Sequence, residues 1–252
     1  MQSRKVAEGR AGPAHKTLYA GAWLAVLAFA AWTVALSGRA QAVQPQPYEP
    51  SDELEKALAL SPKLAHGDSL HRAYCAKCHG TEGWGSASDG RTPALAGQHY
   101  QYLVKQIADL RRGELGQDRG AFHVATLEVL RDNQAIADVA AYLAGLKPNP
   151  QPRAGRGNRL GEGGEIYDWL CRDCHQDSGD GEAIFFTPRI SAQHYEYVLQ
   201  QLEDFADGHR VNAPPEVLDL AAALSAEQRA AVADYISRLA RPAAQAPPDV
   251  PR

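Results

Sequence analysis

Sulfur-containing residues are scarce in this chain of 252 residues, which has four cysteines and one methionine, Met1. No cysteine is spare, because all four lie in two pentapeptides, Cys75-Ala76-Lys77-Cys78-His79 and Cys171-Arg172-Asp173-Cys174-His175. Runs typical of strands are also scarce, which argues against the βαβ pattern around a thioredoxin-like Cys-x-x-Cys motif. No catalytic base, nucleophile or phosphate-binding loop stands in a convincing context.

The pentapeptides have the pattern Cys-x-x-Cys-His, which is typical of c-type haem attachment. Two thiols can form thioethers to the vinyl groups of one haem, and the adjacent histidine then becomes the proximal iron ligand. Zinc ribbons separate their cysteine pairs by about 15–20 residues, whereas these pairs start 96 positions apart (171 minus 75). Two disulfides would leave both histidines unexplained. We therefore predict two covalent haems, one on Cys75 and Cys78 with His79 as iron ligand, the other on Cys171 and Cys174 with His175.

Residues 1–42 have the pattern of an export segment. Basic residues precede an uncharged stretch of 20 residues at 17–36, and Ala40-Gln41-Ala42 is a small-x-small cleavage site. The stretch is also long enough to span a bilayer as a transmembrane helix. It is therefore either a cleaved signal peptide or an uncleaved anchor in the inner membrane. In both cases we expect the remainder to face the periplasm.

An internal repeat organises the rest of the chain. Residues 67–75 match residues 163–171, and residues 92–102 match residues 187–197 at a shift of 95. A Pro- and Gly-containing stretch separates the copies and is typical of an extended linker. The predicted segments are a flexible lead-in at 43–60, a first domain at 61–147, a linker at 148–159, a second domain at 160–241 and a flexible tail at 242–252.

Apolar residues recur at intervals of three and four within each repeat, which predicts helices. The pattern is clear at 100–110, 136–143 and 232–239. Each repeat is too short to bury a large core of its own, and a haem would supply the missing apolar mass. We expect an all-α fold of two tandem domains, each wrapped round a covalent haem, after an N-terminal apolar helix.

Charge is distributed unevenly between the two halves. Residues 51–147 carry 11 basic and 12 acidic side chains, whereas residues 148–252 carry 10 and 16, a balance of −6 (10 minus 16). An acidic surface argues against nucleic acid as a partner. It favours redox protein partners with a basic docking face.

Taken together, these motifs resemble the dihaem cytochromes c of the c4 type, which are built from two tandem class I cytochrome c domains. The resemblance covers roughly residues 60–240 and is carried by the attachment sites, the Thr-Pro segments, the helix starts that follow them and the final Ala-Tyr helices. It implies electron transfer between redox partners. It also implies that the carbonyl of Pro93 holds the ring of His79, and that of Pro188 the ring of His175, which fixes ring orientation and raises ligand basicity.

The chain departs from this family in its sixth iron ligands. Class I domains normally use a methionine, but the one methionine, Met1, precedes the apolar stretch at 17–36, so we expect a methionine ligand on neither haem. His123 is the best candidate for the first haem, 44 residues after the proximal histidine (123 minus 79). On the second haem, residues 214–218 offer no good ligand; His209 could reach the iron if its loop folds inward, and an open or water-ligated iron is the alternative. An imidazole in place of a thioether should lower the reduction potential.

His99 and His194 stand at equivalent helix starts, where we expect surface or hydrogen-bonding groups rather than ligands. The leading function is electron transfer in the periplasm or at the outer face of the inner membrane, with Fe(II)/Fe(III) cycling at both haems and no catalytic residue. The alternative is a haem enzyme or ligand sensor, similar to a peroxidase or a thiosulfate dehydrogenase, that uses an open sixth position on the second haem. A third hypothesis is that the chain is a subunit of a respiratory complex.

Overall fold

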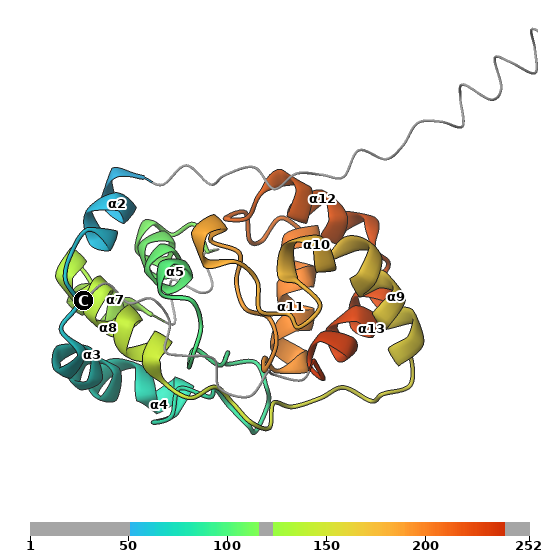
Figure 1. Ribbon diagram of the computed structural model, residues 1–252, viewed down its shortest axis with the longest axis horizontal. Coiled ribbons are helices and arrows are strands. Elements are labelled where there is room, and N and C mark those ends of the chain that lie inside the picture. The colour runs from blue at the N-terminus through green and yellow to red at the C-terminus, as the bar shows by residue number, and fades with distance from the viewer. Residues whose placement is uncertain (1–50, 116–122, 240–252) are drawn as a thin grey trace, which may run out of the picture. The chain divides into compact units, whose positions relative to one another are not determined.

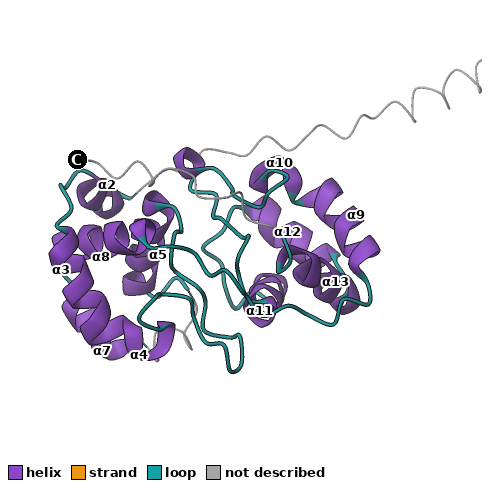
Figure 2. Cartoon of the chain, turned by 60° about the horizontal axis from the view of Figure 1, so that its bottom comes forward, coloured by secondary structure: helices purple, strands orange, loops and turns teal. Residues whose placement is uncertain are grey.

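The computed structural model describes residues 51–115 and 123–239, and the regular elements of this part are helices (Figures 1 and 2). An isolated bridge between Glu182 and Thr187 is the one β-type pairing there. The predicted all-α fold is confirmed. No helix in the described ranges combines the length and the apolar character needed to cross a bilayer. The predicted export segment and the tail at 242–252 lie outside these ranges.

The first repeat consists of short helices around the first Cys-x-x-Cys-His pentapeptide. A π-helical turn, η1 (His71–Cys75), joins the two helices that flank it in sequence. The helices are α2 (Asp52–Leu58), α3 (Leu64–Leu70), α4 (Ala76–His79), α5 (Tyr100–Arg112), α7 (Val124–Val129) and α8 (Asn133–Gly145).

The second repeat follows the same order, with its attachment helix directly after a longer first helix. A short 3-10 turn, η2 (Ala183–Phe185), lies in its loop. Its helices are α9 (Leu160–Leu170), α10 (Arg172–His175), α11 (Tyr195–Ala206), α12 (Pro215–Ala223) and α13 (Ala226–Ile236). The described residues of both repeats belong to one compact unit. The domain boundaries at 61–147 and 160–241 stay predictions.

In each repeat the helix that leads towards the pentapeptide packs against the last helix, α3 with α8 and α9 with α13 (Figure 1). Glycine makes both crossings possible. A Cβ atom on Gly67 would lie 2.1 Å from the carbonyl oxygen of Asp138, and one on Gly163 would lie 2.2 Å from that of Ala231. These distances are far below van der Waals contact, so the backbones approach more closely than any side chain allows.

An aspartate on the last helix of each repeat, at a different position in the two repeats, holds the chain that enters α3 or α9. Asp138 is fully buried and accepts hydrogen bonds from the backbone of Lys63 at 2.6 Å and from His66 Nδ1 at 2.7 Å. Asp234 accepts from the backbone of Gly157 at 2.6 Å. Buried carboxylates need such partners, because burial without them costs several kcal/mol. Helices α3 and α9 are therefore each fixed at the start as well as at the crossing.

Two separate apolar clusters fill the repeats. The first gathers side chains from α2, α3, α5 and α8, with Tyr100 and Ile136 at its centre. The second is smaller and centres on Tyr167, Val198 and Val232. Each cluster includes the first cysteine of its pentapeptide among the residues packed against it. The cores therefore end at the attachment sites.

Candidate functional site

The two attachment sites present their thiols in similar positions on the fold. Cys75 ends η1 and Cys78 lies in α4, whereas Cys171 is the C-cap of α9 and Cys174 lies in α10. All four are free thiols. Burial, with the neighbouring thiol second, raises the pKa of Cys75 to about 11 and that of Cys171 to about 12. Both first thiols are therefore protonated near neutral pH.

Both proximal histidines are oriented by a backbone carbonyl. His79 Nδ1 donates a hydrogen bond to the oxygen of Pro93 at 3.0 Å, and His175 Nδ1 donates to that of Pro188 at 3.0 Å. This bond places the ring proton on Nδ1 and leaves Nε2 as a lone-pair donor. Burial lowers the pKa of both histidines to about 4. Both rings are thus neutral, as a metal ligand must be.

A glycine lets each pentapeptide loop approach its Thr-Pro segment. Gly85 has φ +79°, and a Cβ atom there would lie 2.3 Å from the oxygen of Thr92. Gly181 has φ +69°, and a Cβ atom there would lie 2.4 Å from the oxygen of Pro188. Another residue at either position would push away the carbonyls that orient the histidines.

His123 faces the proximal histidine of the first repeat. It is the N-cap of α7, and its ring centre lies 6.4 Å from that of His79, with the planes inclined by 32°. Two imidazoles that ligate one first-row metal ion from opposite sides, through bonds of about 2 Å, have ring centres roughly 6 Å apart. The structure therefore brings the two predicted ligands together at the spacing of a ligand pair. A narrow apolar depression at Cys75 is lined by Leu70, Tyr74, Cys75, Thr126, Val129, Leu130 and Val139.

The second repeat has no equivalent histidine in that position. His209 is exposed in the turn after α11, and no ring contact in the described residues joins it to His175. Residues 214–218 begin α12, with Pro214 as the N-cap. Glu216 lies near the attachment site, because its charge adds to burial in raising the pKa of Cys174. Ligation by His209 thus stays a prediction that no observed contact supports.

Arg210, the residue after His209, is buried, with 4% of its surface exposed, whereas His209 is exposed. Its guanidinium lies 4.8 Å from the ring centre of Phe205 and donates to Gln201 Oε1, Gln106 Oε1, Asn212 Oδ1 and the Tyr102 hydroxyl. All four acceptors are neutral. No carboxylate in the described ranges lies within ion-pair distance of Arg210, and Gln201 Nε2 is buried without a partner.

Such a cluster calls for an anion, since a buried cation is costly unless it is paired. A haem carries two propionate groups, and their carboxylates are anions of the kind that Arg210 lacks as a partner. The residues present thus fit the cofactor that the pentapeptides predict. Sequence reasoning missed this cluster, although the shift of 95 relates Gln106 to Gln201 and Tyr102 to Tyr197 and could have indicated it.

The chain is similar to known cytochromes over most of the described residues. A cytochrome c family model matches residues 64–147. Cytochrome c4 of Azotobacter vinelandii is 36% identical over 181 residues, which are 66% of this chain and 85% of that protein. The crystal structure of reduced recombinant cytochrome c4 from Pseudomonas stutzeri has a TM-score of 0.62 at 27% identity, with 71% of this chain and 100% of that chain covered.

A further relative carries a name that refers to a partner. The thiosulfate dehydrogenase electron acceptor of Stutzerimonas stutzeri is 30% identical over 176 residues, which are 66% of this chain and 78% of that protein. Within these likenesses the two cysteine pairs imply two covalent haems. With its two helical repeats, its two Cys-x-x-Cys-His sites and this degree of identity, the chain belongs to the cytochrome c4 family of dihaem electron carriers.

Proposed function

We propose that the chain is a periplasmic dihaem cytochrome that passes electrons between redox proteins, and that its first haem is ligated by His79 and His123. The observation that carries this proposal is the 6.4 Å distance between the ring centres of His79 and His123. A bound haem supplies a reversible Fe(II)/Fe(III) couple. The protein supplies the ligands, the burial and a surface for docking.

Different side chains around each site would attach the haem, orient the proximal histidine and exclude water. Cys75, Cys78, Cys171 and Cys174 would hold the haems covalently, and Pro93 and Pro188 would fix the proximal rings through the carbonyl bonds described above. The apolar walls exclude water, which fixes the dielectric around the iron and with it the reduction potential. No side chain in this arrangement needs to gain or lose a proton for an electron to pass.

Ligation by two histidines would separate this chain from its Met-ligated relatives in reduction potential. A thioether favours Fe(II), whereas an imidazole is a stronger σ-donor and favours Fe(III). The first haem should therefore have a lower potential than the haems of a Met-ligated cytochrome c4. A potentiometric titration that puts both haems at ordinary Met/His potentials would contradict the proposal.

Low-temperature EPR of the oxidised protein tests the ligands directly. We expect a low-spin signal for the first haem, and an optical spectrum without the weak far-red band of methionine ligation. A high-spin first haem would overturn ligation by His123. The second haem is assigned in the same experiment, because an open iron gives a high-spin signal from about half of the total haem.

The exposed position of His209 favours a second candidate function. If the second iron lacks a protein ligand on its sixth side, that haem can bind a small ligand, as in an enzyme or a sensor. Carbon monoxide should then bind to about half of the reduced haem, and His209→Ala should leave the spectra unchanged. Carbon monoxide binding to neither haem would contradict this candidate.

Partners and location follow from charge and from the export segment. The acidic second half suits a redox partner with a basic docking face, and salt should weaken that encounter. The relative named above makes a thiosulfate dehydrogenase one candidate donor, and a respiratory complex another. Fractionation of cells that produce the full chain distinguishes a periplasmic protein from one anchored in the inner membrane by residues 17–36, and recovery in the cytoplasm would contradict both.

A further inference from the structure

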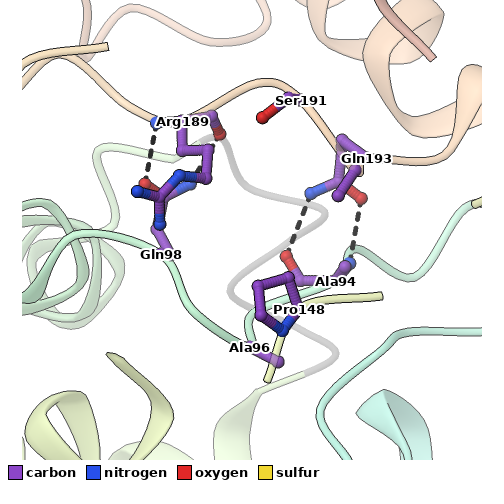
Figure 3. A pocket seen from close by; sticks show the side chains of 8 residues that line it. Ala94, Ala96, Gln98, Pro148, Arg189, Ser191 and Gln193 are labelled. Carbon is purple, nitrogen blue, oxygen red and sulfur yellow. Dashed lines mark hydrogen bonds between the residues drawn. The ribbon is translucent and has the colours of Figure 1, made fainter. Parts of the chain in front are cut away.

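The two repeats bind each other through a pair of equivalent glutamines, Gln98 before α5 and Gln193 before α11. Gln98 Nε2 donates to the oxygen of Arg189 at 2.7 Å, and its Oε1 accepts from the nitrogen of Arg189 at 2.8 Å. Gln193 makes the same two bonds to Ala94, at 3.0 Å and 2.9 Å. Figure 3 shows both pairs on facing loops. Both glutamines are buried, with less than a tenth of their surface exposed.

The side chains of these glutamines have little freedom. Gln98 Oε1 also accepts from the nitrogen of His99 at 2.9 Å, and Gln193 Oε1 from that of His194 at 3.1 Å. The histidines make further bonds across the interface. His99 Nε2 donates to the oxygen of Asp180 at 2.6 Å, and His194 Nε2 to that of Trp84 at 2.8 Å. Each Gln-His pair therefore holds a loop of the other repeat.

The peptide groups held in this way are those that orient the proximal histidines. The N–H of Ala94 belongs to the same peptide group as the carbonyl of Pro93, which accepts the bond from His79. One continuous chain of hydrogen bonds thus runs from Gln193 of the second repeat to His79 of the first. The mirror chain runs from Gln98 through the Pro188–Arg189 peptide to His175.

Hydrogen bonds in such a chain strengthen one another. A peptide whose N–H is donated has a more negative carbonyl oxygen, and cooperative gains are roughly 10–30% per bond. A stronger bond from the carbonyl to Nδ1–H makes the imidazole a better donor to iron. Hydrogen bonding behind the axial ligand is one of the protein's means of setting a haem potential.

We propose that Gln193 and Gln98 are positioning residues that act crosswise, each strengthening the proximal histidine of the haem in the other repeat. The inference rests on the proposed function, because it assumes a haem on each pentapeptide. It goes further in giving each repeat control over the potential of its neighbour's haem. The two potentials are then properties of the docked pair of repeats.

The test is a pair of substitutions in the holoprotein with the potential of each haem measured separately. Gln193→Leu removes the acceptor for Ala94 N–H, so we expect the first haem to move to higher potential while the second stays near its original value. Gln98→Leu should do the reverse. Gln200→Leu is the matched control, because Gln200 bonds within α11 to Asp204 at 2.8 Å and should move neither potential.

Two further variants separate polarisation of the peptide from loosening of the interface. Gln193→Glu keeps an acceptor for Ala94 N–H and should not raise the potential of the first haem. His194→Phe removes the bond to Trp84 without touching the peptide of Pro93, and it should leave the first haem unchanged. The NMR shift of the His79 Nδ1 proton in the reduced protein gives a readout that does not depend on the potential, and it should move in Gln193→Leu.

The proposal is overturned if Gln193→Leu shifts its own repeat's haem instead of the first, or if Gln193→Glu and His194→Phe raise the first potential as much as Gln193→Leu does. Failure of the proposed function would show differently. If His123 does not ligate the first haem, the EPR spectrum of the unsubstituted protein will lack the low-spin signal expected for that haem. The crosswise pattern of shifts in reduction potential will still be present.

Discussion

Single residues would decide how the haem of each repeat is ligated. The first repeat has a histidine where its relatives are expected to have a methionine, and the ring centre of His123 lies 6.4 Å from that of His79. The second repeat has an exposed His209 and a buried Arg210 in adjacent positions. The two repeats therefore share a fold while they differ at the residues proposed for the sixth ligand, which would govern reduction potential and access to the iron.

Replacement of His123 by a residue with a thioether should reverse the expected lowering of the first haem's reduction potential. We predict that His123→Met raises the potential of the first haem and introduces the far-red absorption band of methionine ligation, because a thioether favours Fe(II). Spectroelectrochemistry with optical spectra measures both changes. His209→Met is the control and should alter neither property of the first haem. Equal effects of the two substitutions would rule out ligation by His123.

Arg210 should contribute strongly to the stability of the haem-loaded protein. Removal of one partner from a buried ion pair costs about 3–5 kcal/mol, because the other charge stays buried and unpaired. We expect Arg210→Met to lower the free energy of unfolding by about that amount, measured by chemical denaturation of the holoprotein. Arg131→Met removes a guanidinium from an exposed pair with Glu128 and should cost at most about 1 kcal/mol. A small effect of Arg210→Met would show that no propionate is paired there.

Sequence reasoning succeeds at residues whose role is set by position within a repeat. The positions of Pro93 and Pro188 follow from the motif, and their carbonyls lie at hydrogen-bond distance from the proximal rings. His123 could be located by counting along the repeat. His209 and Arg210 could not be told apart in this way, since the neighbouring α5 decides which of two adjacent polar residues turns inward, through Gln106.

At the scale of elements, glycines allow the closest contacts between helices. Gly163 in α9 lies against the carbonyl oxygen of Ala231 in α13, whereas Gly161, two residues earlier in the same helix, has no atom near its Cβ position. The two glycines share a helix and differ only in what surrounds them. They therefore separate the effect of crowding from the effect of helix propensity.

Alanine substitutions at these two sites should have opposite signs. We expect Gly163→Ala to destabilise the second repeat by about 1–3 kcal/mol or more, because the added methyl group forces α9 and α13 apart. Gly161→Ala should stabilise it by about 0.4–1 kcal/mol through the lower entropy of the unfolded chain. Thermal unfolding followed by circular dichroism measures both. The same sign for both substitutions would contradict the role of the crossing.

Helices were predictable from apolar spacing: α5 and α8 lie where the spacing indicates them, and α13 (Ala226–Ile236) overlaps the predicted range 232–239. The π-helical turn η1 was not predictable from the sequence. In the first repeat His71 is buried there and its Nε2 bonds to the oxygen of Gly80 at 3.0 Å, whereas in the second repeat Tyr167 reaches Gln176 from a regular helix. Apolar periodicity carries no information on such local changes of helical pitch.

At the scale of the whole molecule, most hydrogen bonds between the repeats have a backbone group as one partner. Gln98, His99, Gln193 and His194 each bond to a main-chain atom of the other repeat. The internal repeat indicated that these residues are equivalent in pairs, and the two histidines were expected to be surface or hydrogen-bonding groups. Their targets could not be predicted, because docking depends on two surfaces that no periodicity in the sequence relates.

One of these contacts should make stability depend on pH. Burial lowers the pKa of His99 despite its bond to the Asp180 carbonyl; Arg189 lowers it further, and the carboxylates of Asp180 and Glu182 oppose this. A histidine whose folded pKa is lowered binds its proton more readily in the unfolded chain. Stability is therefore full above the unfolded pKa, about 6.5, and is lost as the pH falls towards the lower folded value.

His99→Gln should flatten this part of the pH profile, because an amide can still donate to the Asp180 carbonyl but does not titrate. Denaturation at a series of pH values below neutrality gives the stability profile of the original protein and of the variant. In the difference between the two profiles, the contributions of other titrating groups cancel. Parallel profiles for the original protein and the variant would contradict the assignment to His99.

The bond from Gln193 to the Ala94 peptide also has a consequence for the order in which the protein matures. Protein chains emerge with the N-terminus first, so Cys75 and Cys78 become available for haem attachment before Gln193 has emerged. A half-made chain can thus form the bond from His79 to Pro93, but not the bond that strengthens it. The first haem would leave the attachment machinery with one potential and acquire its final one when the second repeat docks.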